Sequence, residues 1–236
     1  MVKQAAEWPA EAASGPDFRR VQTWIFDLDH TLYTIDAERH AAMAERICLF
    51  VQRHFGLARD PAWALQKRYL EDYGSTLSGL VRHHNVDPDA YHDFVNDIDA
   101  LALAPDAPLR AGLERLAGRR IIFTNNCGRF AARVLERIGV ADLFADIVDA
   151  RVMNFVPKPN PSAYDVVVAR GAIAAEAAAM FDDSPRNLLP AHDLGMTTVW
   201  VKTGPVPAPG TAPLPRPDHI HYEADDLAKF LETIRI

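Results

Sequence analysis

Short apolar runs alternate with amphipathic segments along the second half of this chain. The runs are only a few residues long, as is typical of buried strands: Arg120–Thr124, Asp146–Asp149, Ala178–Phe181 and Thr197–Val201. The segments around them carry apolar residues at helical spacing: Arg110–Leu116, Arg129–Ile138, Pro161–Arg170, Pro185–Leu194 and Asp225–Thr233. Strands separated by helices in this order predict a parallel sheet with helices on both faces.

A further apolar run, Val21–Asp27, stands far upstream of the others and predicts the first strand. The block behind it has helical periodicity and no strand pattern, with helices expected at Ala37–Phe55, Asp60–Tyr73, Ser75–His84 and Asp87–Ile98. Most loops are only a few residues long, so a block of this length is an insert. We expect a core of residues 21–35 and 104–236, and a helical insert of residues 36–103.

Three other segments complete the predicted organisation. Residues 1–20 are polar and rich in alanine, and we expect a flexible N-terminal tail. Gly204–Pro217 is rich in proline and predicts a surface connector, since proline can continue neither a strand nor a helix. His219–Tyr222 is expected to form an edge strand.

Composition narrows the choice of partners and compartment. The net charge of −7 argues against binding to a nucleic-acid backbone, which needs clustered lysine and arginine. The apolar runs are too short to span a bilayer, so we expect no membrane partner. Two cysteines in 236 residues, Cys48 and Cys127, suggest a reducing compartment, and a cytoplasmic location is the simplest account.

Candidate chemistry begins directly behind the first strand. Asp27 and Asp29 follow an apolar run, and an unpaired buried carboxylate costs several kcal/mol or takes up a proton. A hard cation such as Mg²⁺ would offset that cost, whereas an acidic strand end that faces water would need no partner. The other strand ends favour the cation, because they bring further polar residues to the same edge: Thr124, Lys158, Asp182 and Asp183. Carboxylates, one ammonium and one hydroxyl together suit phosphoryl transfer.

These segments resemble, in order along the chain, the four motifs of the haloacid dehalogenase-like (HAD-like) hydrolase superfamily. Asp27–Leu32 matches the first motif, Thr124 the second, Lys158 the third and Asp182–Asp183 the fourth. The resemblance implies a Rossmannoid α/β fold with a parallel sheet, helices on both faces and a small α-helical cap. The predicted insert stands where that superfamily carries the cap.

The resemblance also implies a role for each catalytic residue. Asp27 would be the nucleophile that forms an aspartyl-phosphate, and Asp29 would protonate the leaving oxygen and then activate water. Thr124 would hold the phosphoryl oxygens, and Lys158 would tie Asp27 to the phosphate.

The cofactor that the resemblance implies is Mg²⁺. Asp27, Asp183 and the backbone carbonyl of Asp29 would be its ligands, and Asp182 would either join this metal-binding group or orient Lys158 or a metal-bound water. Asn187, one helical turn beyond Asp183, is a candidate outer partner of this acidic group.

Within the superfamily, the chain is most similar to the pyrimidine 5′-nucleotidase subgroup. That similarity rests on four segments: Phe26–Tyr33, Phe123–Asn126, Phe181–Leu188 and Tyr69–Leu80. It implies a small phosphorylated substrate, a pyrimidine nucleoside 5′-monophosphate. Asn125, Asn126 and Tyr73 are the candidate substrate-binding residues, although packing between the helices of the insert is the favoured role for Tyr69 and Tyr73.

Three other functions stay open at this point. One is a phosphatase that acts on another small ester, such as phosphoglycolate or a sugar phosphate. A haloacid dehalogenase is less favoured, because those enzymes use no metal and lack an acid at the position of Asp29. A non-catalytic binding protein is also disfavoured, because every catalytic position holds a competent residue.

Overall fold

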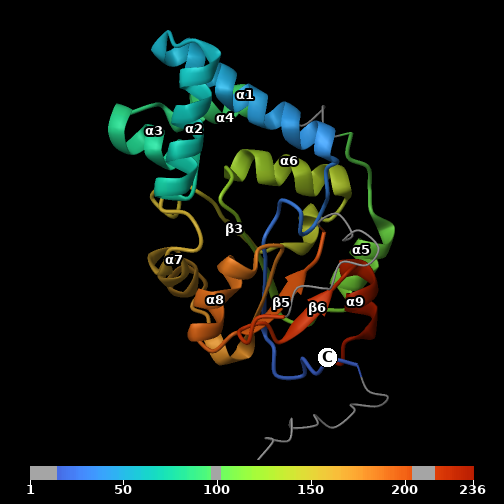
Figure 1. Cartoon of the computed structure of the whole chain (residues 1–236). Coiled ribbons are helices and arrows are strands. Elements are labelled where there is room, and N and C mark those ends of the chain that lie inside the picture. Colours follow the sequence, from blue (N-terminus) through green and yellow to red (C-terminus); the bar gives the residue numbers. More distant parts are fainter. Residues whose placement is uncertain (1–14, 97–101, 204–215) are drawn as a thin grey trace, which may run out of the picture.

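A parallel sheet of six strands forms the centre of the computed structural model, which describes residues 15–96, 102–203 and 216–236 (Figure 1). The strands, in order across the sheet, are β3 (Asp146–Val148), β2 (Arg119–Phe123), β1 (Thr23–Phe26), β4 (Ala178–Asp182), β5 (Thr197–Val201) and β6 (Tyr222–Ala224). Each neighbouring pair is parallel. This sheet confirms the α/β class that the alternating pattern predicted.

Each face of the sheet has its own apolar core, because successive strand residues point to opposite faces. Trp24 and Phe26 of β1 belong to one core and Ile25 to the other, and all three are fully buried. The first face is covered by α5 (Ala107–Glu114), α6 (Gly128–Ile138) and α9 (Leu227–Thr233). The second is covered by α7 (Pro161–Gly171) and α8 (Pro185–Asp193).

The described part of the predicted helical insert holds four helices, which stand above the sheet in Figure 1. They are α1 (Ala37–Phe55), α2 (Arg59–Tyr73), α3 (Thr76–His84) and α4 (Pro88–Val95). A third apolar cluster lies among them and includes Cys48, Val51 and Leu80. The insert therefore has a hydrophobic core of its own.

Side-chain caps mark the starts of α1 and α3, whereas α2 begins without one. The carboxylate of Asp36 accepts from Arg39 N, and Ser75 Oγ accepts from Ser78 N. The helices α1 and α2 end at Gly56 and Gly74, both with positive φ, as glycine at this position allows. None of the helices in the described ranges combines the length and apolar character that crossing a membrane requires.

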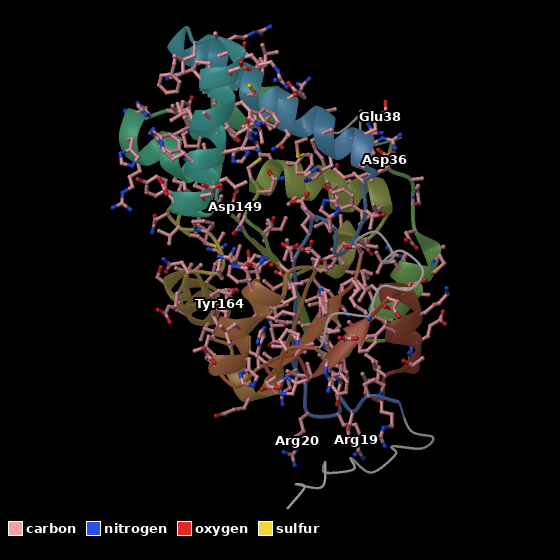
Figure 2. The ribbon with its side chains drawn as sticks, viewed as in Figure 1. Arg19, Arg20, Asp36, Glu38, Asp149 and Tyr164 are labelled. Carbon is pink, nitrogen blue, oxygen red and sulfur yellow. The ribbon has the colours of Figure 1, made fainter. Side chains whose placement is uncertain are left out.

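The expectation of a flexible tail over residues 1–20 is wrong for its last residues. Phe18 is 1% exposed and stacks on Trp24, with ring centroids 5.6 Å apart, and it also packs against Phe181. The backbone N–H of Phe18 donates to Arg235 O at 2.8 Å. A single apolar residue in a polar segment has no periodicity, so the sequence pattern did not reveal it. Arg19 and Arg20 lie at the end of the molecule away from the insert (Figure 2).

Other expectations differ in their boundaries or lie outside the described residues. The edge strand covers Tyr222–Ala224 and not His219–Tyr222, because Nδ1 of His221 accepts from Thr198 N before the strand begins. Residues 1–14 of the tail, the predicted end of α4 at residues 97–98 and most of the proline-rich connector are outside the described ranges.

Replacing Phe18 by alanine tests its place in the core. We expect Phe18→Ala to lower the free energy of unfolding by about 3–5 kcal/mol, since it removes a buried aromatic side chain. Leu70→Ala is the control, because Leu70 is 55% exposed, and should cost less than about 1 kcal/mol. Urea unfolding monitored by circular dichroism measures both, and a small loss for Phe18→Ala would mean that residues 15–20 are loose after all.

Candidate active site

The carboxyl ends of three adjacent strands bring the candidate residues together. Asp27 follows β1, and its N–H donates to Phe181 O at 2.9 Å. Thr124 follows β2 and is fully buried, and its N–H donates to Val148 O at 3.0 Å. Asp182 is the last residue of β4. Because β1 lies between β2 and β4, Asp27 stands at the middle of this edge.

A buried ammonium joins two of these carboxylates. Lys158 Nζ lies 2.8 Å from Asp27 Oδ1 and 2.7 Å from Asp182 Oδ2. The exposed fractions of these three residues are 2%, 7% and 0%. Because these ion pairs are buried, removing one of the charged side chains would leave an uncompensated charge out of contact with water.

Burial and charge shift the pKa values of this group. Burial raises the pKa of Asp27, and the carboxylates of Asp182 and Asp29 add to the effect of burial, which Lys158 only partly offsets. Burial alone would lower the pKa of Lys158, but Asp182 and Asp27 more than compensate and raise it. The ammonium therefore stays charged at neutral pH.

The acidic pair at the end of β4 faces two different sets of partners. Asp182 Oδ1 accepts from Asn187 Nδ2 and from Ser184 N, both at 2.9 Å, while its other oxygen contacts Lys158. The structure thus places Asn187 against Asp182. Asp183 is partly buried, and burial, followed by the charge of Asp182, raises its pKa to about 6.

Three carboxylates could share one cation. Oxygen atoms of Asp27, Asp182 and Asp183 all lie within 4.8 Å of one another. With Asp29 close enough to raise the pKa values of both Asp27 and Asp183, four carboxylates face the single ammonium of Lys158. An oxygen-only donor set with surplus negative charge fits a hard divalent cation such as Mg²⁺. Each of these residues belongs to the ligand set expected from the sequence.

Asp29 is held by neighbours that the sequence did not indicate. Tyr33 OH donates to Asp29 Oδ1, and Asn126 Nδ2 lies 3.4 Å from Asp29 Oδ2. Tyr33 is only 8% exposed, and burial followed by Asp29 raises its pKa, so that the phenol remains protonated. Thr31 Oγ1 lies 3.4 Å from Asp27 Oδ2 on the same turn. The spacing of Asp29 and Tyr33 gave no signal of this contact, because residues 28–33 form a tight turn.

Asn125 and Asn126 are occupied by neighbouring protein groups. Asn125 Oδ1 accepts from Lys158 N at 2.8 Å, and Asn125 Nδ2 donates to Lys158 O at 3.2 Å, so this side chain fixes the backbone of the lysine. Asn126 contacts both Asp29 and Asn96. Their expected contacts with substrate stay predictions.

Tyr73 lines a cleft between the insert and the core. The cleft has a volume of about 1060 Å³, and its walls include Tyr73, Arg82, Asn125, Lys158 and Asn187. Tyr73 OH is 2.6 Å from His83 Nε2, and Arg82 lies over its ring. Tyr69, in contrast, is 5% exposed and packs against Gly79, so it belongs to the core of the insert.

The raised pKa of Asp183 predicts how the metal-free protein responds to pH. Its folded pKa of about 6 lies above the ordinary 3.8, so between pH 4 and 6 the folded protein binds more protons than the unfolded chain. Stability conferred by this group is therefore present at pH 4 and is lost as the pH rises through 6.

In EDTA, Asp183→Asn should be more stable than the parent by about 1 kcal/mol at pH 7, with a difference near zero at pH 4. Added Mg²⁺ should stabilise the parent and not the variant. Glu232→Gln, which removes an exposed carboxylate of α9, is the control, and its free energy of unfolding should match that of the parent at both pH values. Urea unfolding between pH 4 and 7.5 measures the difference, and a constant difference would contradict the raised pKa.

Comparisons with known proteins agree with this geometry. The model of the haloacid dehalogenase-like hydrolase family matches residues 21–195, well over half of the chain. Phosphate metabolism protein 8 of Saccharomyces cerevisiae is 28% identical over 197 residues, which are 77% of this chain and 61% of that protein. The chain thus spans less than two thirds of this relative's length.

Solved structures show the same fold at low identity. A HAD phosphatase from Thermococcus onnurineus has a TM-score of 0.56 and 20% identity, covering 92% of this chain and 100% of its own. The HAD-hydrolase YfnB from Bacillus subtilis, bound to magnesium, has a TM-score of 0.55 at 20% identity, with the same coverage of both chains. A 2-haloacid dehalogenase from Pseudomonas syringae has a TM-score of 0.56 at 22% identity. The match covers 90% of this chain and 97% of the dehalogenase. The chain belongs to the haloacid dehalogenase-like hydrolase family.

Proposed function

We propose that this hydrolase is a Mg²⁺-dependent phosphatase that cleaves phosphate monoesters through an aspartyl-phosphate on Asp27. The observation that carries the proposal is the position of Lys158 Nζ between Asp27 and Asp182, next to the acidic group of Asp27, Asp182 and Asp183. A nucleophile, a fixed positive charge and ligands for a cation meet there at one sheet edge. Phosphoryl transfer needs these three components.

In the first step, a carboxylate oxygen of Asp27 attacks phosphorus and the bond to the ester oxygen breaks. Asp29 gives a proton to that leaving oxygen. Lys158 stabilises the charge that develops on the phosphoryl oxygens, and the hydroxyl of Thr124 contributes a hydrogen bond. Mg²⁺ held by Asp27, Asp183 and the backbone carbonyl of Asp29 would neutralise part of the phosphate charge.

In the second step, Asp29 takes a proton from a water molecule, which attacks the phosphorus of the aspartyl-phosphate. The bond between phosphorus and the Asp27 oxygen breaks, so inorganic phosphate leaves and the carboxylate is restored. Asp29 thus acts first as an acid and then as a base. Its contacts with Tyr33 and Asn126 keep it beside the reacting group in both steps.

The substrate that we infer is a pyrimidine nucleoside 5′-monophosphate, bound beneath a cap formed by residues 36–103. The cleft of about 1060 Å³ lies between cap and core and has room for a nucleotide. Tyr73 could stack on a base, and Asn125 lines the same cleft and holds Lys158. A dehalogenase is disfavoured because that chemistry leaves the surplus of carboxylates beside Asp27 without a function.

An aryl phosphate tests the chemistry. Hydrolysis of 4-nitrophenyl phosphate should require Mg²⁺, and Asp27→Asn should lower kcat at least about 1,000-fold, since it removes the nucleophile. Asp193→Asn is the matched control and should keep full activity, because that carboxylate is exposed and stands at the end of α8 opposite to Asp183. Full activity in excess EDTA would sink the mechanism.

A panel of natural monoesters tests the substrate class. We expect kcat/KM for UMP and CMP to exceed that for phosphoglycolate and glucose 6-phosphate by at least about tenfold, because the cap cleft would supply binding energy to the base. Release of inorganic phosphate measures all four reactions in the same way. An equal or reversed ranking would favour a phosphatase for another small ester and leave the mechanism intact.

A further inference from the structure

A chain of side-chain hydrogen bonds joins the cap to Asp29. Asn96, the residue that follows α4, donates from Nδ2 to Asn126 Oδ1 at 2.9 Å. Asn126 Nδ2 in turn lies 3.4 Å from Asp29 Oδ2. Asn96 belongs to the cap and Asn126 to the loop behind β2, so the chain crosses from one part of the molecule to the other.

The orientation of the Asn126 amide is fixed by a backbone group. Its Oδ1 also accepts from Cys127 N at 2.9 Å, and a backbone N–H can only donate. The oxygen must therefore face Cys127 and Asn96, and the NH₂ group must face Asp29. Asn126 can only act as a donor toward that carboxylate.

His92 fixes the other end of the chain. It is 7% exposed, and burial lowers its pKa to about 4, so the ring is neutral at physiological pH. Its Nδ1 lies 3.2 Å from Asn96 Nδ2, and a neutral ring can accept there. Asn96 Nδ2 thus has acceptors in His92 and Asn126, and Cys127 Sγ lies 3.7 Å from the same nitrogen. The hydrogen bonds thus form a consistent series, in which Asn96 donates to His92 and to Asn126, and Asn126 donates to Asp29.

We propose that Asn96 is a positioning residue of the cap, which through Asn126 holds the carboxylate of Asp29 in the orientation that proton transfer to the leaving group requires. This inference rests on the proposed phosphatase activity and adds to it a contribution of the cap to the chemical step. Tyr33 holds one oxygen of Asp29 from within the same loop, and Asn126 holds the other. Without Asn96, Asn126 Oδ1 keeps Cys127 N as a donor but loses its tie to the cap, so the 3.4 Å contact of Asn126 Nδ2 with Asp29 Oδ2 loosens.

Other residues of α4 attach this helix to the core by ion pairs alone, and they provide a matched control. On the same helix, Asp93 pairs with Arg129 at 2.8 Å, and Asp89 pairs with Arg151 at 2.8 Å. Both ion pairs tie α4 to the core, and neither residue of α4 contacts Asn126 or Asp29. Asp149 lies at the junction of cap and core (Figure 2), where it accepts from Gly128 N at 2.7 Å and partly offsets the effect of burial on the pKa of His92. Asp93→Ala removes one of these ion pairs and none of the hydrogen bonds that lead from Asn96 to Asp29, and Arg129 keeps a contact with Asp89 at 3.6 Å.

The experiment compares a good and a poor leaving group. We measure kcat/KM with Mg²⁺ for 4-nitrophenyl phosphate and for phenyl phosphate, because this ratio reports the step in which Asp27 is phosphorylated. Phenolate leaves poorly without a proton, whereas 4-nitrophenolate hardly needs one. Asn96→Ala should lower kcat/KM for phenyl phosphate about tenfold and for 4-nitrophenyl phosphate less than about twofold. The tenfold loss is smaller than the full effect of a general acid, because Asp29 itself is still present. Asp93→Ala should leave the ratio between the two substrates unchanged.

A second readout does not depend on activity. In ¹⁵N spectra of the metal-free protein, the side-chain amide signals of Asn126 should move in Asn96→Ala and stay in place in Asp93→Ala. Asn96→Asp keeps the size of the side chain and loses its donors, so it replaces the alanine variant should that variant fail to fold. We expect the aspartate variant to give the same two results.

The outcomes separate this proposal from the one on which it rests. An equal loss on both substrates in Asn96→Ala, or the same change of ratio in Asp93→Ala, would overturn the positioning role. A parent protein that hydrolyses neither ester with Mg²⁺ would overturn the phosphatase activity. The Asn126 amide signals would then decide on the contact alone, with unmoved signals in Asn96→Ala counting against it.

Discussion

The buried ammonium of Lys158 is the interaction on which the rest of the structure depends. It joins the carboxylates that follow β1 and end β4, two strands that are neighbours at the middle of the sheet. A dry core could not hold these carboxylates without it, because their mutual repulsion grows as water is excluded. Asn125 fixes the backbone of the lysine from the third strand end, so the sheet order itself assembles the site.

The sequence predicted the features that the order of strands determines, and it did not predict contacts that depend on how distant segments are placed. Strand ends such as Asp27 and Asp182 were predictable because a parallel sheet gathers its carboxyl ends at one edge, and the structure brings them together there. The contacts of Tyr33 and Asn96 with their partners were not predictable, because turn geometry and cap placement decide them. Phe18 was missed for a similar reason, since one apolar residue has no pattern.

The cap has two kinds of connection to the core, and they differ in what they can transmit. Exposed ion pairs such as Asp93 with Arg129 hold one surface to another, and salt screens them. Ser78 Oγ, which donates to Phe155 O at 2.8 Å, is a shorter-range contact on the cleft side. The strength of a hydrogen bond depends on angle as well as distance, so a small displacement of the cap would change its hydrogen bonds to the core. The hydrogen bonds between cap and core, and not the exposed ion pairs, are therefore the contacts through which the cap could affect the proposed reaction.

The contact between Phe18 and Arg235 has a practical consequence for handling the molecule. Residues near both ends of the described core lie side by side, at the end away from the cap and its cleft (Figure 2). A surface tether attached beside residue 16 or residue 235 would stand clear of the insert and of the cleft. The protein could therefore be immobilised through this end for single-molecule measurements without obstructing the cleft.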